Sequence, residues 1–510
     1  VEGTFDDCQR LVKAAFQNPV PGVRLSSANS INIGMNATVG SDVNLVGNVS
    51  NAGFQDIDTD LGGSLTVAAG GDTDIVGPIS ANGNDIVNNS NLAGADGGLN
   101  IGAGVAVTDV RSLDNNGDLV LEAGSSVTVD NLTALGNANT PGSFTNAGTT
   151  TIGAMATLTA DSITNESGTI TVAGTLAGTG NTLNNDAAII VAGGGALTDA
   201  GAINNNSGGT IAFLGAGTIN ADDDNTGGEA LNNTGGITTA GVGATVTVGD
   251  GTADILNNGT DGTGTVVGGG TITIGAGDTF GGTGLALNNE GAGSIVNIGT
   301  GSDLTVASLS NTNGATINND GTITGPALIE NGQGGTFNNT ANGNIGAFTN
   351  AASATLATNA GTMGAVINGA NATFTATGTS QQTSVLNSGT ANLNGGSTTG
   401  DVTQADAATG DLNIGTTGTA FNVGSNLIAQ GGTTNIGDDG VITGTTTVGD
   451  GANTAAVVNS TGTLTGAATV NSDGTLNVNG GTATSVQVDG GGAVNVGTTG
   501  TAASVTTTLV

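Results

Sequence analysis

Residues 162–174, Ser-Ile-Thr-Asn-Glu-Ser-Gly-Thr-Ile-Thr-Val-Ala-Gly, are the stretch that decides the fold of this chain. Polar and apolar residues alternate at 169–172, and this period of two is that of a β-strand. Asn165 and Gly168 separate this run from the one before it, and both residue types favour tight turns. The stretch therefore predicts two short strands joined by a tight turn.

The same pattern recurs along the chain. In its middle part the last Asn before each turn steps by 19, 20, 20, 28, 25 and 31 residues, at Asn146, Asn165, Asn185, Asn205, Asn233, Asn258 and Asn289. Further on, apolar residues step by 21, 22, 22, 20 and 18, at Leu393, Ile414, Ile436, Val458, Val478 and Val496. A repeat of about 20 residues that tolerates insertions is typical of a solenoid.

The period and the repeat length together predict the fold class. Three short strands and their turns fill about 20 residues, and such coils stack by parallel pairing. We therefore expect an all-β protein, a single-stranded parallel β-helix (β-solenoid) that is right-handed and spans residues 35–510. Val, Ile, Leu, Ala and Phe should point inward and Thr and Ser outward. Stacked Asn side chains should form hydrogen-bonded ladders.

Residues 1–34 are unlike the rest. They hold three of the four Lys and Arg residues and the single cysteine, Cys8. The run from Phe5 to Pro19 predicts a helix because its apolar residues recur at helical spacing and Asn-Pro ends it. We expect a short helical cap or interface segment at 1–34, and the alternative is a fused fragment without a role.

Part of this N-terminal segment resembles a known enzyme family. EGTFDDCQRLVKAAF at 2–16 and LSSANSIN at 25–32 resemble a fragment of threonine synthase, a pyridoxal-phosphate enzyme. Nothing after Met35 resembles that family's cofactor lysine or phosphate loop, so the resemblance does not imply its activity.

The repeat itself resembles another group of proteins. SITNESGTITVAGTL at 162–176 and TINNDGTITG at 316–325 are similar to the β-helical passenger repeats of bacterial autotransporters and filamentous-haemagglutinin-like adhesins. This resemblance covers nearly all of 35–510 and implies an extracellular rod.

Composition excludes several functions. The chain has 4 Lys and Arg against 40 Asp and Glu, a net charge of −36, and no His, Trp or Tyr. So few cations exclude nucleic-acid binding, and the lack of a long apolar run argues against membrane insertion. We expect no enzyme, because Arg111 is the one cation after residue 34 and no Tyr or Trp can hold a sugar. A polysaccharide-active β-helix enzyme is the remote alternative.

Acidic clusters offer weak candidates for calcium, and no other cofactor is expected. Asp56, Asp58 and Asp60 have the spacing of the first three ligands of a calcium loop, but the glycine and the bidentate Glu of that motif are absent. The remaining weak candidates are Asp222, Asp223 and Asp224, with the pairs Asp72/Asp74 and Asp438/Asp439. A solvated acidic turn is the simpler interpretation of each.

The open edges of a solenoid suggest a function. Residues 504–510 are strand-like and show no cap, so one subunit can pair end to end with the next. We expect an extracellular or cell-surface structural protein whose partner is a second copy, stacked head to tail into a filament, sheath or layer. The alternative is a monomeric adhesin rod that binds a surface or another cell.

Overall fold

The computed structural model describes the chain from Val23 to Leu509 with gaps, and side chains are described outside 23–55, 230 and 506–509. The gaps are 34–37, 40–42, 52–53, 59, 92–97, 131–140, 180–181, 199–200, 222–229, 241–242, 249–254, 260–265, 326–328, 409, 453 and 498–501. The helix expected at 5–19 lies outside the described residues. The rest of that segment contributes a strand, β1 (Val23–Ile33), which pairs in parallel with β3 (Val43–Asn51).

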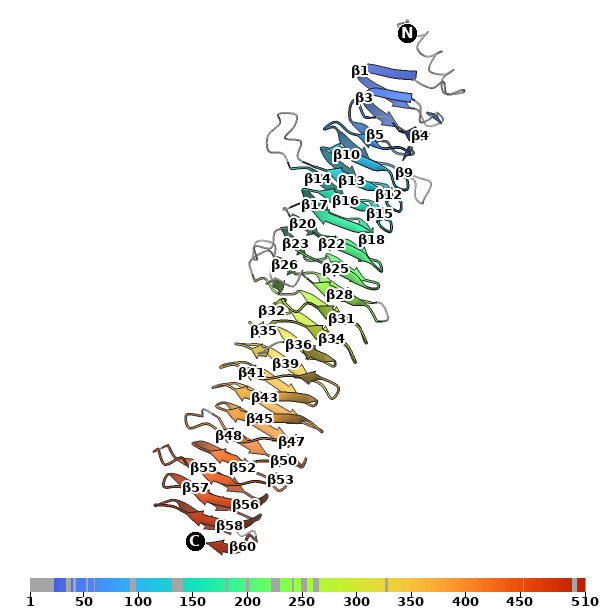
Figure 1. The fold of residues 1–510 in the computed structure, drawn as a ribbon. Coiled ribbons are helices and arrows are strands. Elements are labelled where there is room, and N and C mark those ends of the chain that lie inside the picture. The colour runs from blue at the N-terminus through green and yellow to red at the C-terminus, as the bar shows by residue number, and fades with distance from the viewer. Residues whose placement is uncertain are drawn as a thin grey trace. The chain divides into compact units, whose positions relative to one another are not determined.

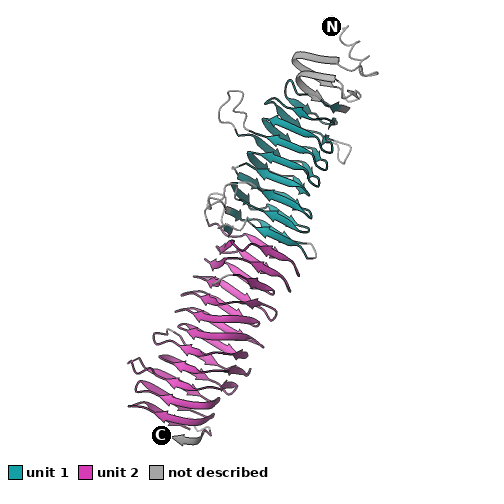
Figure 2. Ribbon diagram, viewed as in Figure 1, with its two compact units in different colours: residues 1–256, 261–265 teal, residues 257–260, 266–510 magenta. Residues whose placement is uncertain are grey.

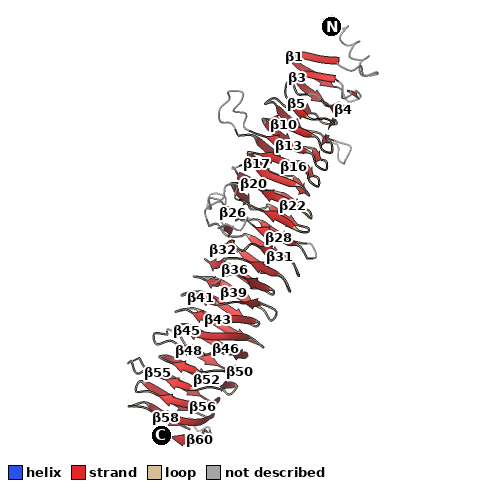
Figure 3. Ribbon diagram, viewed as in Figure 1, coloured by secondary structure: helices blue, strands red, loops and turns tan. Residues whose placement is uncertain are grey.

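The chain divides into two compact units, residues 1–256 with 261–265 and residues 257–260 with 266–510 (Figure 2). The described residues contain strands and no helix (Figure 3). Accordingly, no described segment is a helix able to cross a membrane. In each unit the strands stack as successive parallel coils of about 21 residues (Figure 1). The β-solenoid prediction is confirmed, while its handedness stays a prediction.

In unit 1 the strands form two sheets. The first contains, besides β1 and β3, β5 (Leu65–Val67), β7 (Ile79–Ser80), β8 (Asp85–Asn88), β10 (Ala106–Val110), β11 (Ser112–Asn115), β13 (Ser126–Val129), β14 (Ser143–Asn146), β16 (Thr157–Ala160), β17 (Ser162–Asn165), β19 (Thr175–Gly178), β20 (Thr182–Asn185), β22 (Gly195–Thr198), β23 (Ala202–Asn205), β25 (Gly217–Ile219), β26 (Ala230–Asn233) and β28 (Thr245–Val248). The second contains β2 (Thr38–Val39), β4 (Phe54–Ile57), β6 (Asp72–Ile75), β9 (Gly98–Ile101), β12 (Asp118–Leu121), β15 (Thr149–Ile152), β18 (Thr169–Val172), β21 (Ala188–Val191), β24 (Thr210–Phe213) and β27 (Gly236–Thr239). Strand β29 (Ile255–Asn258) begins in unit 1 and ends in unit 2.

Unit 2 repeats this arrangement. Its first sheet contains β31 (Thr279–Gly281), β32 (Ala286–Glu290), β34 (Asp303–Thr305), β35 (Ser308–Thr312), β37 (Thr322–Thr324), β38 (Ile329–Asn331), β40 (Asn344–Ile345), β41 (Phe348–Asn350), β43 (Thr362–Asn368), β45 (Gln381–Asn387), β47 (Gly396–Thr398), β48 (Val402–Gln404), β50 (Phe421–Val423), β51 (Leu427–Ala429), β53 (Gly440–Ile442), β54 (Thr446–Val448), β56 (Thr463–Val470), β58 (Thr482–Val488) and β60 (Ser504–Leu509). Its second sheet contains β30 (Thr271–Ile274), β33 (Ile295–Ile298), β36 (Thr316–Asn319), β39 (Thr336–Asn339), β42 (Leu356–Asn359), β44 (Thr373–Thr377), β46 (Thr390–Asn394), β49 (Leu412–Ile414), β52 (Gly432–Ile436), β55 (Ala456–Ser460), β57 (Gly474–Val478) and β59 (Ala493–Val496).

One coil of unit 1 shows how the sequence pattern produces this fold. Strands β15, β16 and β17 follow one another, and each pairs in parallel with the strand three further along the chain. The residues that alternate in sequence alternate in burial, so Ile163 and Ile170 are fully buried while their Thr neighbours are half-buried. The strand expected at 169–172 and its turn are confirmed.

Insertions lengthen the connections and leave the strands in register. The longest step within unit 1, 28 residues from Asn205 to Asn233, still pairs Ile203 with Leu231 and Asn205 with Asn233. The extra residues fall between β25 and β26. Coil length therefore varies without disturbing the rows of side chains.

The interior contains an amide ladder, as predicted. In unit 1 each ladder Asn donates a side-chain N–H to the Oδ1 of the next, at 2.7–2.8 Å, through Asn88, Asn115, Asn146, Asn165, Asn185, Asn205 and Asn233. In unit 2 the same direction and distances run through Asn258, Asn289, Asn311, Asn331, Asn350, Asn368, Asn387 and Gln404. We call these rows the inner ladders. They satisfy polar groups that are almost fully buried.

Unit 2 carries a further row on its outer surface, which we call the outer ladder. Here each Asn donates to the Asn one coil before it, through Asn495, Asn477, Asn459, Asn435, Asn413 and Asn392. The inner ladder donates toward later coils and the outer ladder toward earlier ones. The inner row also changes character after Gln404, because its register partners Ala429, Val448 and Val470 are apolar.

The stacking of one row differs from the spacing of the apolar residues in the sequence. Ile436 pairs with Ser460, which in turn pairs with Val478. Val458 belongs to the neighbouring inward row, opposite Thr434 and Leu476. Residues two apart on a strand face the same side, so both Val458 and Ser460 point inward. The apolar spacing leads from Ile436 to Val458, but the backbone register places the buried Ser460 opposite Ile436.

Candidate functional site

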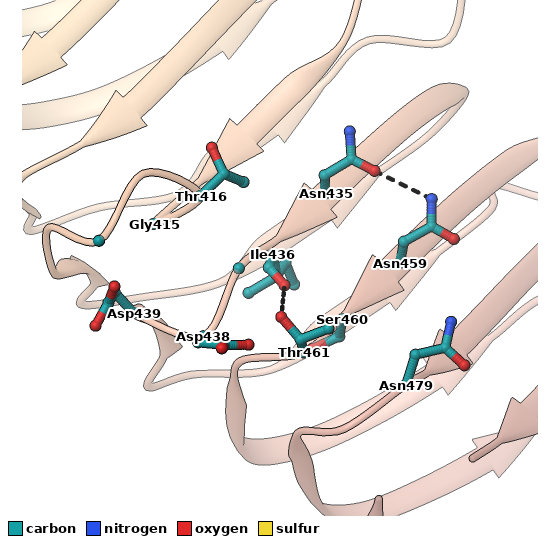
Figure 4. Close-up of a pocket in the computed structure, with 12 residues that line it drawn as sticks. Gly415, Thr416, Asn435, Ile436, Asp438, Asp439, Asn459, Ser460, Thr461 and Asn479 are labelled. Atoms are coloured by element: carbon teal, nitrogen blue, oxygen red, sulfur yellow. Dashed lines mark hydrogen bonds between the residues drawn. The ribbon is translucent and has the colours of Figure 1, made fainter. Parts of the chain in front are cut away.

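A polar hollow on unit 2 is the candidate site (Figure 4). It forms where successive turns shorten. The connection from β49 to β50 has six residues, 415–420, the next from β52 to β53 has three, and the one from β55 to β56 has two. The long turn thus overhangs the shorter ones, and the step between them is hollow.

Glycines allow the turns at the hollow to stack closely. A Cβ on Gly437 would lie 2.2 Å from the carbonyl oxygen of Gly415, so these two turns are in backbone contact. Gly415 itself has a φ of +60°, a conformation that residues with a side chain rarely adopt. The backbones of the two turns therefore approach more closely than side chains would allow.

The lining combines carboxylates, amides and hydroxyls. Asp438 and Asp439 come from the turn after β52, and Thr416 from the overhanging turn. Asn435 and Asn459, members of the outer ladder, lie along one side, with the Asn459 amide donating to Asn435 at 3.1 Å (Figure 4). No Lys or Arg is among the lining residues. The site is acidic and rich in hydrogen-bonding groups.

Ser460 gives the hollow a buried polar atom. Its side chain is 1% exposed, and its Oγ has no hydrogen-bond partner within the protein. It lines the hollow beside Thr461, whose hydroxyl donates to the carbonyl oxygen of Ile436. A buried hydroxyl without a partner costs free energy, and Ser460 shares this condition with other buried side chains, among them Thr434 and Thr446.

The acids predicted to bind calcium lie elsewhere. Asp56 on β4 is opposite Asp74 on β6, and burial raises the pKa of Asp56, helped by the Asp74 and Asp58 carboxylates. Asp60 accepts a hydrogen bond from the backbone N–H of Ser80 at 2.7 Å. Among the described residues, no three acidic, His or Cys side chains converge as a metal site. The calcium prediction for Asp56, Asp58 and Asp60 therefore gains no support, and Asp222, Asp223 and Asp224 lie outside the described residues.

The solenoid's single cation is engaged locally. The Arg111 guanidinium binds both carboxylate oxygens of Asp85, with a distance of 2.7 Å from Nε to Oδ1. This hydrogen bond also lowers the pKa of Asp85. Neither residue lines the hollow.

Two Asp side chains have pKa values that are shifted in opposite directions. They allow a test of how ionised carboxylates affect the stability of the fold. Burial raises the pKa of Asp114, and the carboxylates of Asp85 and Glu166 raise it further. A folded-state pKa above the unfolded value means that ionised Asp114 opposes folding at neutral pH, and that this cost disappears as pH falls. We expect Asp114→Asn to stabilise the chain by about 0.5 kcal/mol at pH 7 and to have no effect below pH ~3, as measured by urea denaturation.

Asp401 provides the control of opposite sign. Its pKa is lowered by a hydrogen bond from Ser425 and by the backbone N–H of Asn426. A lowered folded-state pKa contributes stability that is present above the unfolded value and lost as pH falls. Asp401→Asn should therefore destabilise the chain at pH 7. A loss of stability in both variants would show that the raised pKa of Asp114 does not reflect a cost.

Comparison with protein-family models gives no match, and comparison with curated proteins gives none either. Neither the autotransporter-like nor the threonine-synthase-like resemblance is therefore supported by a relative. The coarser statement stands, that the chain is a β-helical repeat protein.

The hollow itself could not be expected from the sequence. The sequence marks Asp438 and Asp439 only as a pair of acids, and no sequence pattern marks Thr416, Asn459 or Ser460. The available signal was the shortening of the turns after three successive strands, which can be read only when the strand register is known.

Proposed function

We propose that the chain is an extracellular structural protein whose solenoid stacks head to tail into a surface filament, sheath or layer. The β-solenoid fold suits a structural or adhesin-like repeat protein. Parallel coils use the same backbone hydrogen-bond pattern on both sides, so each coil can serve as the template for the next. A contact of this kind is head-to-tail and gives an open filament unless it closes into a ring.

The observation that supports this proposal is the exposure of strand β59. The Val496 side chain is 43% exposed, whereas Val478, its register partner one coil earlier, is fully buried. Among the described strands, β59 pairs with β57 alone. Asn495 is exposed and donates to Asn477. A further parallel coil stacked on β59 would bury Val496 and pair this strand edge.

Electron microscopy of the purified chain tests the assembly. We expect filaments that Val496→Lys prevents, because a lysine on an edge strand opposes pairing. Leu214→Lys is the matched control, since Leu214 is a comparably exposed apolar residue (53%) in unit 1, and it should leave the filaments unchanged. Single particles at every concentration, or filaments that survive Val496→Lys, would contradict head-to-tail stacking through β59.

The extracellular location rests on composition. A chain with 40 acidic residues against 4 basic ones repels itself unless salt screens it, and salt water outside the cell supplies such screening. Proteolysis of intact source cells should remove the chain if this location is right, whereas full protection would contradict it.

The second candidate is a monomeric adhesin rod that binds a surface or another cell. The polar hollow of unit 2 favours it, because a recess lined by carboxylates, amides and hydroxyls offers hydrogen-bonding groups to a ligand. Discrete particles that adhere to a surface would support this function over the filament.

A further inference from the structure

We propose that one face of unit 1 is a docking surface for a second copy of this chain, which lies against the first side by side and antiparallel. This face is the outward side of the second sheet over the successive strands β15, β18, β21, β24 and β27, together with the turns that follow them. We call it the neutral face. The inference goes beyond stacking through β59, because it concerns the side of the solenoid and needs no free strand edge.

The neutral face has no ionisable side chain among its described residues. Its strands stack in register, so residues two apart on each strand form outward rows. The outward residues of the five strands are Thr149, Thr151, Thr169, Thr171, Ala188, Ile190, Thr210, Ala212, Gly236 and Thr238. The described residues of the turns that follow are Gly, Ala, Met and Leu. Two copies of a chain with a net charge of −36 repel each other, so contact is least opposed where both surfaces are uncharged.

Acidic residues border this face and do not lie on it. Glu166 and Asp186 precede β18 and β21 in the sequence, so they lie at the opposite edge from the turns that follow these strands. Glu122 follows β12, one coil before β15, and its carboxylate accepts the backbone N–H of Ala103 at 3.0 Å. That hydrogen bond directs Glu122 toward the preceding coil and away from the neutral face.

Two large apolar side chains project from the neutral face. Met155, in the turn after β15, is 82% exposed, and Leu214, directly after β24, is 53% exposed. Three coil steps separate β15 from β24, a distance of about 14 Å. The residues directly after the two intervening strands are Ala173 and Ala192. Exposed apolar side chains that gather on one surface mark an interaction site.

The backbone of Met155 is a second, independent observation. Its φ is +61°, in the left-handed region that residues with a large side chain rarely adopt. In the two preceding coils the equivalent turns place Gly104 and Gly124 in this conformation, and the Gly124 N–H donates to the carbonyl oxygen of Ala154 at 3.1 Å. A methionine here costs free energy that a glycine would avoid. Its exposed side chain gains little from packing within the chain, so contact with a second molecule is what would offset this cost.

A second copy is the partner that these features favour. A partner of opposite charge would gain more from the acidic surfaces elsewhere on the chain, whereas the neutral face is compatible with itself. A contact in which both copies use the same patch has a two-fold axis, so the two solenoids run antiparallel. With the axis between β18 and β21, Met155 of each copy meets Leu214 of the other. Ala173 and Ala192 then face each other and let the backbones approach.

The size of the face indicates a weak contact between two isolated copies. Five coils at ~4.8 Å, with a strand and its turn ~20 Å across, give roughly 500 Å² per copy. The total of about 1,000 Å² is near the lower limit of a specific interface. If the chain also stacks end to end, many such contacts add along two filaments and join them into a layer. This last step alone rests on the proposed stacking.

Sedimentation of the full chain that carries Val496→Lys tests the pairing, because this change keeps end-to-end stacking out of the measurement. We expect a concentration-dependent dimer that becomes tighter as sodium chloride increases, since salt screens the repulsion between two acidic chains. Leu214→Lys in this background, which should leave end-to-end stacking intact, should weaken the dimer at least ~10-fold. Ile367→Lys is the matched control, because Ile367 is similarly exposed (46%) but lies on the first sheet of unit 2, and it should leave the dimer unchanged.

Two further variants separate pairing from folding and fix the orientation. Met155→Gly should fold as stably as the parent, because glycine adopts a positive φ freely, and should still lose most of the dimer. Chains in which Cys8→Ser is combined with either Met155→Cys or Leu214→Cys are oxidised alone and as a mixture. The mixture should form the mixed disulfide-linked dimer in preference to either like pair.

Several results would overturn the proposal. They are a monomer at every concentration and salt, a dimer that salt dissociates, equal weakening by Leu214→Lys and Ile367→Lys, and cross-linked like pairs in preference to the mixed one. Filaments that persist in Val496→Lys contradict stacking through β59 alone, and the cross-linking experiment still scores lateral pairing. Failure of one proposal is therefore distinguishable from failure of the other.

Discussion

Replacing Gly168 with alanine should open the solenoid at the coil that carries it. A Cβ on Gly168 would lie 1.7 Å from the carbonyl oxygen of Gly148 one coil earlier, and that oxygen accepts the backbone N–H of Thr169 at 3.0 Å. Because the clash is with backbone, no side chain can move away to relieve it. The two coils must separate and lose parallel pairing, which we expect to cost at least ~3 kcal/mol.

Gly193→Ala is the control for Gly168→Ala. Gly193 lies in a turn of the same unit, and a Cβ there would meet no atom within 4 Å. Its φ is not in the left-handed region, so alanine fits and should stabilise the chain slightly by restricting the unfolded state.

Hydrogen exchange is the appropriate measurement for this pair of variants. A solenoid is held together by contacts between neighbouring coils, so a damaged coil opens locally before the whole chain unfolds. We expect Gly168→Ala to lose amide protection in β15 and β18 first. Equal protection of these strands in the two variants would show that the close approach of Gly148 and Gly168 has no structural importance.

The features that repeat could be predicted from the sequence. The Asn spacing identified seven inner-ladder positions, and the ladder forms because a buried amide can donate to and accept from identical neighbours. Strand alternation identified the inward rows, since one face of every strand must avoid water. These predictions hold because every coil must bury one face of each strand and pair its buried amides, and it does so with the same residue types.

Features that depend on the match between particular coils could not be predicted. The apolar spacing leads from Ile436 to Val458, although the register places Ser460 opposite Ile436. A shift of two residues keeps every side chain on its own face, so alternation cannot detect it. The hollow cannot be predicted for the same reason. It arises from the difference in length between turns that this register stacks on one another. The buried serine and the hollow can therefore be recognised only when the strand register is known.

The inner ladder makes the second large prediction. Asn331 is fully buried, accepts a hydrogen bond from Asn311 at 2.7 Å and donates to Asn350 at 2.8 Å. Asn331→Ala leaves the Oδ1 of Asn350 without this donor in an interior that water does not reach, whereas the Asn311 amide keeps the carbonyl oxygens of Ala315 and Thr336 as acceptors. One unpaired buried group costs about 1–3 kcal/mol, so we expect a loss of about 1–3 kcal/mol in the unfolding free energy, measured by urea denaturation.

The control for Asn331→Ala lies in the same coil. Asn338 on β39 is half-buried, donates to Asn318 at 2.9 Å and accepts from the Thr358 hydroxyl at 3.0 Å. Water can replace these outward-facing bonds, so Asn338→Ala should cost less than ~1 kcal/mol. Similar losses in the two variants would mean that amide stacking contributes equally inside and outside, and that the inner ladder has no special role in stability.

Asn331→Asp separates the hydrogen bonds of Asn331 from its shape. The ionised carboxylate can accept from Asn311 but cannot donate to Asn350, and burial of its charge opposes folding. Burial raises the folded-state pKa of such a carboxyl, so the variant should regain stability as pH falls and the protonated group donates again. Asn331→Ala has no titrating group and should show no recovery relative to the parent chain. A pH-independent deficit in Asn331→Asp would therefore place the damage in packing and not in the direction of the ladder's hydrogen bonds.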